Sequence, residues 1–372
     1  MEFLVDYIIP FVVVLTVLVF IHELGHYWVA RYNGVKVEVF SIGFGPELFG
    51  WTDRAETRWK ISLIPLGGYV RMYGDQDEAS RPDTKALKKM SEELRSQSLH
   101  HKPVGQRIAV SAAGPFANFA FAIITMAVLF AVKGQPILPA KIGDLVPGKA
   151  AALAGLKVGD EIVKVNEQPI KDFTHLRDIV RKNAGHPLDI QVLRDQEELM
   201  IKIIPESVDE TTGEKKPVGQ LGIRPASPEF IRRGPVESLY QAVKVTIDIS
   251  TDTLIGVGQM IIRTRSSDEL GGILSIGDMA GQSAKSGLVG LLWFMALLSI
   301  NLGLINLFPI PMLDGGHLLF YGIEAIRGKP VGEKAQEYAF RLGFLVVIGL
   351  MLMSTWNDLS RYKVFSWLTH WF

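Results

Sequence analysis

The stretch VVVLTVLVFIHELGHYWVARY, residues 12–32, places a His-Glu-x-x-His pattern at the end of a long apolar run. In a helix, positions i and i+4 share one face, so His22 and His26 can bind a single metal ion. Glu23 lies beside them, placed to accept a proton from an attacking water. Ionisable groups at the end of an apolar helix are costly and usually functional. The stretch predicts a membrane-crossing helix with a metal site; interfacial side chains that cap the span are the alternative.

Three further stretches of the chain are long, apolar and free of charged residues. With the first, the four are Phe3–Ile21, Ala109–Val132, Gly287–Phe308 and Leu342–Trp356. A helix needs about 20 apolar residues to cross a hydrocarbon core of about 30 Å, and the fourth reaches this length if Arg341 snorkels. A cleaved signal peptide is the alternative for the first, but Glu2 and Asp6 replace its usual basic residues. The sequence predicts four retained spans.

The composition excludes several classes of site and partner. Lys+Arg and Asp+Glu both number 39, so the formal net charge is zero and nothing indicates a nucleic-acid partner. Cysteine is absent, which excludes disulfides, Cys₄ zinc sites, iron–sulfur ligation and thiol nucleophiles. Any metal must therefore be held by histidine and carboxylate side chains.

Lysine and arginine close to the ends of the spans predict the orientation of the chain. One side carries Arg31, Lys36, Lys102, Arg107, Arg327, Lys329 and Lys334. The other side carries Glu2, Asp6, Lys133, Lys141 and Lys285. The modest bias predicts that residues 31–103 and 309–338 are cytoplasmic, and that both termini and residues 133–286 lie outside.

The external residues 133–286 are typical of a small β-rich module followed by a long helix. The strands expected there are Ile142–Val146, Glu161–Val165 and a hairpin of Leu188–Leu193 with Leu199–Ile204 around Asp195 and Gln196. The helices expected are Ala150–Leu156, Phe173–Lys182 after a Thr cap, and Pro235–Ile262. The last is too polar for a fifth span, so it lies either against the membrane or in the soluble module. Asp209–Pro217 is loop-like, and the aromatic residues of 359–372 suit an interfacial anchor.

A catalytic zinc site needs a third protein ligand and an open position. The first and third spans run in the same direction, so their C-terminal ends reach the same depth. At that depth the chain reads NLFPIPMLDGGH, residues 306–317. Two prolines end the helix, Asp314 follows, and two glycines allow a tight turn behind it. We expect Asp314 to be the third ligand; His317 is its rival, and an ordinary turn aspartate is the alternative.

Together, His22-Glu23-x-x-His26 after a first span and Asn306-x-x-Pro309-x-Pro311-x-Leu313-Asp314-Gly315 after a third resemble the site-2 protease family of intramembrane zinc metalloproteases. Within that family the chain most resembles the bacterial regulator-of-sigma-E type, over nearly its whole length. The resemblance implies Zn²⁺ as cofactor, His22, His26 and Asp314 as its ligands, and Glu23 as general base. It implies that Asn306 holds substrate near the metal; contact between helices is the alternative for this amide.

Residues 61–72 (ISLIPLGGYVRM) alternate β-forming residues around two glycines. In the family such a segment forms re-entrant β-structure whose edge strand pairs with the substrate, which implies substrate-binding roles for Gly67, Gly68, Tyr69 and Val70. A transmembrane helix hides its amides, so a protease must unwind it and offer new backbone partners. An ordinary cytosolic hairpin is the alternative.

The second span contains AGPFAN, residues 113–118, which matches another motif of the family. Its Gly-Pro pair is expected to allow close helix approach and a bend, and Asn118 to support the metal-binding helix. Helix packing alone is the alternative.

The external module resembles a circularly permuted bacterial PDZ domain. The resemblance rests on ALAGLKVGDEI (residues 152–162) and on GQLGI (residues 219–223), which looks like a carboxylate-binding loop and edge strand. It implies a groove at Leu221, Gly222 and Ile223 that takes a peptide or a C-terminus. A groove that only plugs the enzyme is the alternative. The best-known relatives carry two such domains in tandem, whereas one is found here, which leaves size-based exclusion of bulky substrates in doubt.

The expected fold is a polytopic α-helical membrane protein with four transmembrane helices, a re-entrant β segment and an inserted extracytoplasmic α+β PDZ-like domain. The expected divisions are transmembrane helix 1 with HExxH (1–32), a cytoplasmic or re-entrant β region (33–103), transmembrane helix 2 (104–132), the PDZ-like domain (133–228), an amphipathic helix and connector (229–286), transmembrane helix 3 with a cytoplasmic loop (287–338), and transmembrane helix 4 with an aromatic anchor (339–372).

The resemblance implies an intramembrane zinc endopeptidase of the bacterial inner membrane. Its implied substrates are single-span membrane proteins, such as anti-sigma factors or signal-peptide remnants, cut near the cytoplasmic side in regulated intramembrane proteolysis. A catalytically idle PDZ scaffold and a metal transporter that uses the His/His/Asp set as a transit site are the alternatives. The intact Glu23 argues against the scaffold, because a scaffold has no need of a base.

Overall fold

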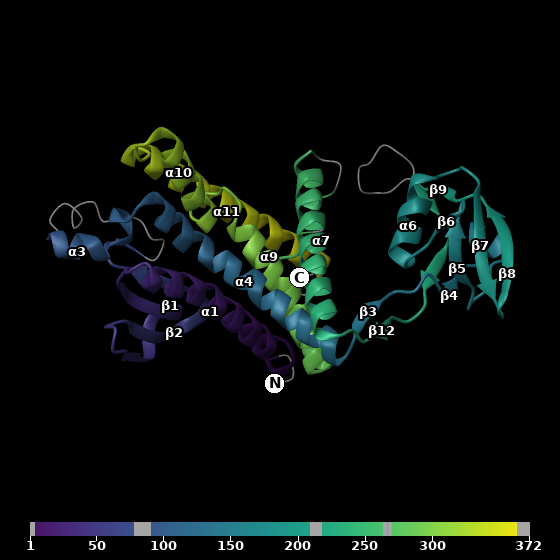
Figure 1. Ribbon diagram of the computed structural model, residues 1–372, viewed down its shortest axis with the longest axis horizontal. Coiled ribbons are helices and arrows are strands. Elements are labelled where there is room, and N and C mark those ends of the chain that lie inside the picture. Colours follow the sequence, from purple (N-terminus) through teal and green to yellow (C-terminus); the bar gives the residue numbers. More distant parts are fainter. Residues whose placement is uncertain (1–3, 78–90, 209–217, 263–265, 267–269, 363–372) are drawn as a thin grey trace, which may run out of the picture. The chain divides into compact units, whose positions relative to one another are not determined.

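The computed structural model describes residues 4–77, 91–208, 218–262, 266 and 270–362 (Figure 1). The chain forms two compact units. One comprises Met1–Met126, Ala242–Thr251 and Asp268–Phe372, and the other comprises Ala127–Gln241 and Asp252–Ser267. The loop expected at 209–217 and the aromatic end at 363–372 lie outside the described residues, so both expectations stay predictions.

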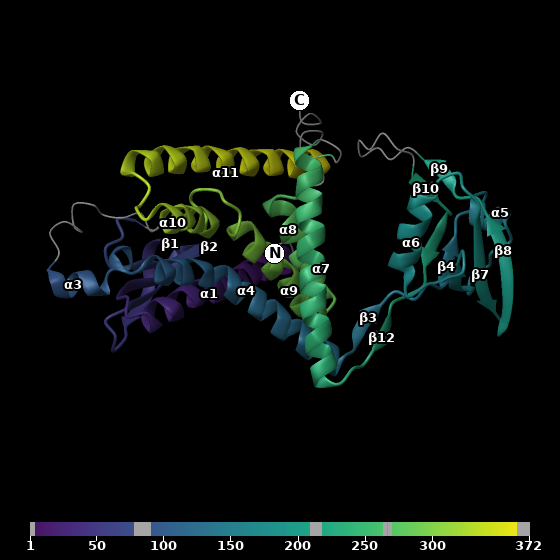
Figure 2. The same ribbon diagram turned by 45° about the horizontal axis from the view of Figure 1, so that its top comes forward.

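Four described helices are long and apolar enough to cross a membrane, as the sequence predicts. They are α1 (Ile9–Tyr32, preceded by a π-helical turn at Leu4–Ile8), α4 (Val104–Val132), α9 (Leu288–Asn306) and α11 (Glu333–Arg361). Helices α1, α4 and α9 lie side by side in both views (Figures 1 and 2). The buried side chains of Val14, Leu18 and Met295 join α1 to α9.

Strands β1 (Val37–Thr52) and β2 (Arg58–Met72) form a bent hairpin beside α1. The stretch from Val39 to Ile42 lies opposite two parts of β2, Arg58–Ile61 on one side and Gly68–Arg71 on the other. Phe40, Val70 and Met72 are buried in one cluster with Ala30 of α1. No other described strand pairs with residues 68–72, so this segment is an edge of the sheet next to α1. A short helix α3 (Glu92–Gln97) and a 3₁₀ turn (Leu99–His101) lead into α4.

A helix that the sequence analysis did not predict, α8 (Ile273–Lys285), packs against α1, α9 and α11. Its N-terminus is capped from α11 rather than by its own residues. Asp358 of α11 is 1% exposed and accepts hydrogen bonds from the backbone N–H groups of Gly272, Leu274 and Ser275. A carboxylate stabilises these otherwise unpaired donors and the positive end of the helix dipole.

Helix α10 (Asp314–Arg327) corrects the expectation of a tight turn behind Asp314. Gly315 and Gly316 are helical, and their role is close approach rather than turning. A Cβ on Gly315 would lie 2.1 Å from the carbonyl oxygen of Phe308, and one on Gly316 would lie 2.6 Å from that of Ile310. The two glycines therefore let the first turn of α10 pack on the chain that precedes it.

The second unit is a β-rich module with its own core. Its strands are β3 (Gln135–Ile137), β4 (Ile142–Leu145), β5 (Glu161–Val165), β6 (Gln168–Pro169), β7 (Leu188–Arg194), β8 (Glu197–Ile203), β9 (Glu206–Val208), β10 (Val218–Gln220), β11 (Ile223–Pro225) and β12 (Glu229–Ile231). Its helices are α5 (Ala150–Leu153) and α6 (Phe173–Lys182), and α7 (Pro235–Ile261) follows. Four strands form a sheet in the order β6-β5-β7-β8, and β11 pairs with β4. The core includes Ile162, Leu176 and Ile190.

Two local features of the module concern a turn and a helix cap expected from the sequence. The hairpin turn at Asp195 and Gln196 is confirmed, and both residues have positive φ (51° and 69°), as a two-residue hairpin loop requires. The Thr cap expected for α6 is wrong: Asp172 caps this helix by accepting from the His175 N–H. An aspartate before the first turn satisfies the same donors as a threonine.

A buried ion pair fixes the loop before β5 to the end of β7. Asp160 is 1% exposed and accepts from both Nε and Nη2 of Arg194 at 2.7 Å. Burial by itself raises the pKa of Asp160, but the Arg194 hydrogen bonds outweigh it and hold the pKa below its usual value. The carboxyl group therefore stays ionised at neutral pH.

Candidate metal centre

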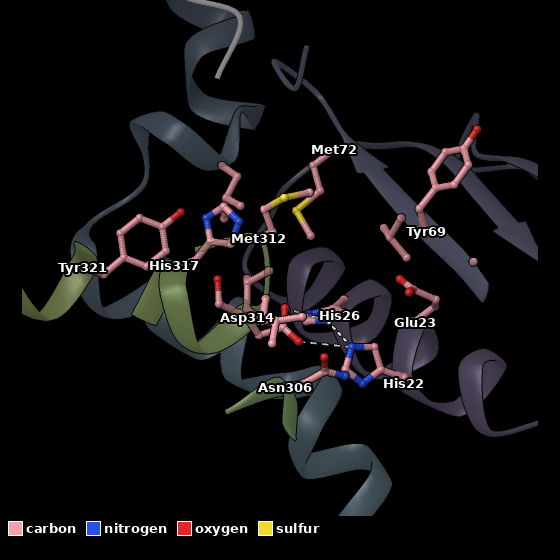
Figure 3. A pocket seen from close by; sticks show the side chains of 16 residues that line it. His22, Glu23, His26, Tyr69, Met72, Asn306, Met312, Asp314, His317 and Tyr321 are labelled. Carbon is pink, nitrogen blue, oxygen red and sulfur yellow. Dashed lines mark hydrogen bonds and ion pairs between the residues drawn. The ribbon is translucent and has the colours of Figure 1, made fainter. Parts of the chain in front are cut away.

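Helix α1 presents His22 and His26 one turn apart on one face. Both side chains are buried, and their Nε2 atoms lie 3.2 Å apart. The i, i+4 spacing in an unbroken helix produces this arrangement, as the sequence predicts. Both nitrogens are directed at one point, where Asp314 also arrives (Figure 3).

Helix α4 lies close against the histidine pair because two glycines leave room. A Cβ on Gly25 of α1 would lie 2.4 Å from the carbonyl oxygen of Ala113. A Cβ on Gly114 of α4 would lie 2.2 Å from Nε2 of His26. The Gly114 position of the AGPFAN motif therefore borders the histidines directly.

The second nitrogen of His26 is held by a backbone carbonyl. Nδ1 of His26 lies 2.8 Å from the carbonyl oxygen of Val110 in α4. A carbonyl can only accept, so Nδ1 carries the proton and the Nε2 lone pair is free. This is the tautomer that binds a metal through Nε2.

Asp314 closes the site from the start of α10. Its Oδ2 lies 3.1 Å from Nε2 of His22, and its Oδ1 lies 3.3 Å from Nε2 of His26. Burial raises the pKa of Asp314, but contact with the two histidines outweighs it and places the pKa well below the usual range. Asp314 is therefore a carboxylate, the form in which aspartate binds metal.

The three side chains fit a zinc ion. One donor atom from each of His22, His26 and Asp314 lies within 4.8 Å of the others. Two imidazole nitrogens and one carboxylate oxygen leave the fourth tetrahedral position open, as in catalytic zinc sites.

The rival ligand His317 does not belong to this group in the described part of the chain. Its ring packs 5.6 Å from that of Phe340 and 6.3 Å from that of Tyr321. It lines the same cavity as the three side chains but approaches from the next turn of α10 (Figure 3).

A cavity of about 200 Å³ opens beside the three donor atoms, and Glu23 lines it together with Gly68, Tyr69 and Val70. The Glu23 carboxylate lies on the side of β2, away from Asp314 (Figure 3). The edge strand and the expected base therefore border one cavity.

The other residues expected to contact substrate differ in where they lie. Asn306, the last residue of α9, lines the cavity next to Asp314. Gly67 does not line it; its φ is +111°, and a Cβ there would lie 2.5 Å from the ring of Phe44. Gly67 thus permits the bend of β2, and the next three residues, Gly68, Tyr69 and Val70, form the cavity wall.

The module has a second cavity, of about 300 Å³, between α6 and the start of β11. Leu221, Gly222 and Ile223 line it together with Leu176 and Arg177 of α6, and their role as a peptide groove stays a prediction. The groove is mainly apolar, with two cationic side chains, Arg177 and Arg181, in its wall.

Three further features of the metal centre were missed by sequence reasoning. The Val110 carbonyl gives no signal in a sequence, because any residue supplies it. Met312 has φ of +94°, unusual for a residue with a side chain, and it lines the cavity. Tyr321 also lines it, and burial raises its pKa to about 12, so the phenol stays neutral.

The apolar helices and the buried site at their ends define the class of protein: a zinc metalloprotease whose active site lies within the membrane. The family model described as Peptidase family M50 matches residues 10–350. The chain belongs to this family.

Two relatives cover nearly the whole chain. A protein of Agrobacterium fabrum whose name places it among the zinc metalloproteases is 43% identical over 364 residues, which span 96% of this chain and 97% of that protein. Protease RseP of Yersinia pestis is 34% identical over 453 residues, which span 94% and 98%. That alignment is longer than this chain, so the Yersinia protein carries insertions that are absent here.

A solved PDZ domain of an SdrC-like protein from Listeria monocytogenes aligns with 24% of this chain and 87% of its own length. The identity is 17% and the TM-score is 0.20, values too low to assign the fold of the module.

Proposed function

We propose that this protease holds its zinc ion through His22, His26 and Asp314 and uses Glu23 as the general base. The observation that carries the proposal is the convergence of the three donor atoms within 4.8 Å, with Glu23 lining the same cavity. Bound zinc polarises a scissile carbonyl and makes water a better nucleophile at neutral pH.

Glu23 moves the proton. Its carboxylate lines the cavity, where one oxygen accepts a proton of the attacking water. The same oxygen then delivers that proton to the leaving amine nitrogen, so that the peptide bond breaks and two chain ends form.

The substrate is expected to add as a strand to the edge formed by Gly68, Tyr69 and Val70. These residues line the cavity; they pair with β1 on one side, and no described strand pairs with their other side. Backbone hydrogen bonds to this edge would hold a segment of substrate extended, which a peptide bond needs before it can be hydrolysed. The Asn306 amide, on the opposite wall, would donate to a substrate carbonyl.

The substrates are proposed to be single-span membrane proteins that reach the site within the bilayer of a bacterial inner membrane. The basic residues after α1 and after α10 support an active site near the cytoplasmic face, with both termini and the module periplasmic. The re-entrant placement of β1 and β2 belongs to this same proposal.

The module is proposed to be a PDZ domain whose groove takes an extended peptide or a C-terminus. The groove at Leu221, Gly222 and Ile223 supports this, because β11 pairs with β4 on one side and borders a cavity on the other. Arg177 adds a positive charge suited to a carboxylate or an acidic side chain.

The catalytic assignment is tested with Glu23→Gln, Asp314→Ala and His317→Ala, purified in detergent. Glu23→Gln is expected to abolish cleavage of a single-span substrate and to keep stoichiometric zinc, because glutamine accepts no proton. Asp314→Ala is expected to lose zinc, whereas His317→Ala keeps it.

Cleavage by Glu23→Gln would refute the role of the base. Zinc retained in Asp314→Ala but lost in His317→Ala would refute the ligand set. Thermal unfolding of each variant shows whether a loss of zinc reflects a loss of fold.

A further inference from the structure

Asn118 of α4 lies against the metal centre with a fully buried side chain. Its Nδ2 is 3.2 Å from Nδ1 of His22, and its Oδ1 makes no hydrogen bond to any described residue. The hydroxyl of Ser299 in α9 donates to the backbone oxygen of Asn118 at 2.9 Å, which fixes this turn of α4. The hydrogen bond recorded for the side-chain amide is therefore the one with the imidazole of His22.

Each of the two histidines needs a hydrogen-bond acceptor beside its Nδ1 atom. A histidine that binds metal through Nε2 carries its proton on Nδ1, so it needs an acceptor at that nitrogen. His26 finds one in the Val110 carbonyl. The group at the corresponding place beside His22 is the amide of Asn118.

The Asn118 amide provides such an acceptor in one of its two orientations. A half-turn about the Cβ–Cγ bond exchanges Oδ1 and Nδ2 without moving any other atom. In either orientation one amide atom faces His22 and the other has no partner, so the hydrogen bonds of Asn118 alone do not choose between them. A metal bound to Nε2 of His22 selects one orientation, because it requires the proton on Nδ1 and hence the amide oxygen Oδ1 facing that proton.

We infer that Asn118 is the positioning residue of His22: in the zinc-bound protein its Oδ1 accepts the His22 Nδ1–H and so fixes the tautomer and the ring for metal binding. The inference rests on the proposed ligand set. Helix α4 then supplies the acceptors for both ligands of α1, one from its backbone at Val110 and one from a side chain.

The test separates an acceptor from a space-filling side chain. Asn118→Leu keeps the size but removes the acceptor, and it is expected to weaken zinc binding roughly 10- to 100-fold, the usual loss when a group that orients a ligand is removed. Asn118→Asp keeps an acceptor of the same shape and is expected to bind zinc at least as tightly as the wild type. The measurement is zinc affinity by chelator competition in detergent at fixed pH.

Matched variants control for packing and folding. Ser299→Ala removes the hydroxyl that holds this turn of α4 but no acceptor of His22, so it is expected to bind zinc as the wild type does. Asn118→Ala removes the acceptor without adding apolar bulk, and it serves if Asn118→Leu does not fold, as judged by thermal unfolding.

Wild-type zinc affinity in both Asn118→Leu and Asn118→Ala would overturn the inference. So would a loss of zinc affinity in Asn118→Asp equal to that in Asn118→Leu, because it would assign Asn118 to packing alone. Asp314→Ala is measured alongside. Full zinc affinity in that variant would refute the ligand set itself, and this failure is distinct from either result at Asn118.

Discussion

Two glycines face the opposite helix where α1 and α4 come closest. Gly25 leaves room for the Ala113 carbonyl, and Gly114 leaves room for the His26 ring. Neither has a positive φ, so what they contribute is the missing side chain. The metal centre therefore depends on this space as much as on its ligands.

Gly114→Ala is expected to impair the metal centre. The added Cβ would lie 2.2 Å from a ring atom of His26, which cannot move aside without leaving its place opposite Asp314. We expect zinc affinity to fall roughly 10- to 100-fold, comparable to losing a group that orients a ligand. Chelator competition in detergent measures this fall.

Gly105→Ala is the matched control, because nothing lies within 4 Å of a Cβ at that position of the same helix. It is expected to bind zinc normally and to stabilise α4 by about 0.5–1 kcal/mol through helix propensity. Equal zinc affinity in both alanine variants would contradict the steric account.

Helix α4 is joined to α10 through a nearly buried ion pair. Arg107 and Glu324 make two parallel hydrogen bonds, of which Nη1 to Oε2 measures 2.9 Å, and their side chains are 12% and 17% exposed. The Arg107 guanidinium also lies 4.9 Å from the centre of the Tyr321 ring. Since α10 begins at Asp314, these contacts fasten the far end of the helix that carries it.

Arg107→Ala is expected to cost about 3–5 kcal/mol of unfolding free energy, because it leaves the Glu324 carboxylate buried without a partner. Arg341→Ala breaks the exposed pair with Glu337 on α11, where both side chains are more than half exposed, and is expected to cost about 0–1 kcal/mol. Denaturant titration in detergent compares the two. Similar small losses would show that the Arg107 pair is solvated.

The elements also show how far the sequence predicts this structure. The long apolar helices and the module strands follow from hydropathy and alternation. Helices α8 and α10 were missed because they are short and a pair of glycines stands at the start of each: just before Ile273 in α8 and just after Asp314 in α10. Each is held by a distant partner, Asp358 of α11 for α8 and Arg107 of α4 for α10. Their contacts are made across more than 80 residues of chain, a separation that local patterns do not reveal.

The metal centre also combines features that the sequence predicts with features that it does not. The sequence shows the spacing of His22 and His26 and the position of Asp314 after the third span. Their convergence could therefore be predicted. The Val110 contact depends on how α4 packs against α1, and the positive φ of Met312 belongs to the segment between α9 and α10; no residue type marks either in advance.

At the scale of the whole molecule, the absence of cysteine makes the proposed orientation directly testable. Ser207→Cys in β9 and Ala325→Cys in α10 place single exposed thiols without changing charge. In intact spheroplasts a membrane-impermeant maleimide is expected to label Ser207→Cys, and to label Ala325→Cys only after lysis. The parent chain, which has no thiol, is the control, and the reverse pattern would invert the topology.

The cap on α8 has a consequence for biosynthesis. Gly272 and its neighbours leave the ribosome long before Asp358, which follows 86 residues later along the chain. Until α11 is made, the first N–H groups of α8 have no carboxylate to accept their hydrogen bonds. This part of the bundle is therefore completed late in translation, and a nascent chain stalled before Asp358 would present an unfinished helix end to the quality-control proteases of the cell.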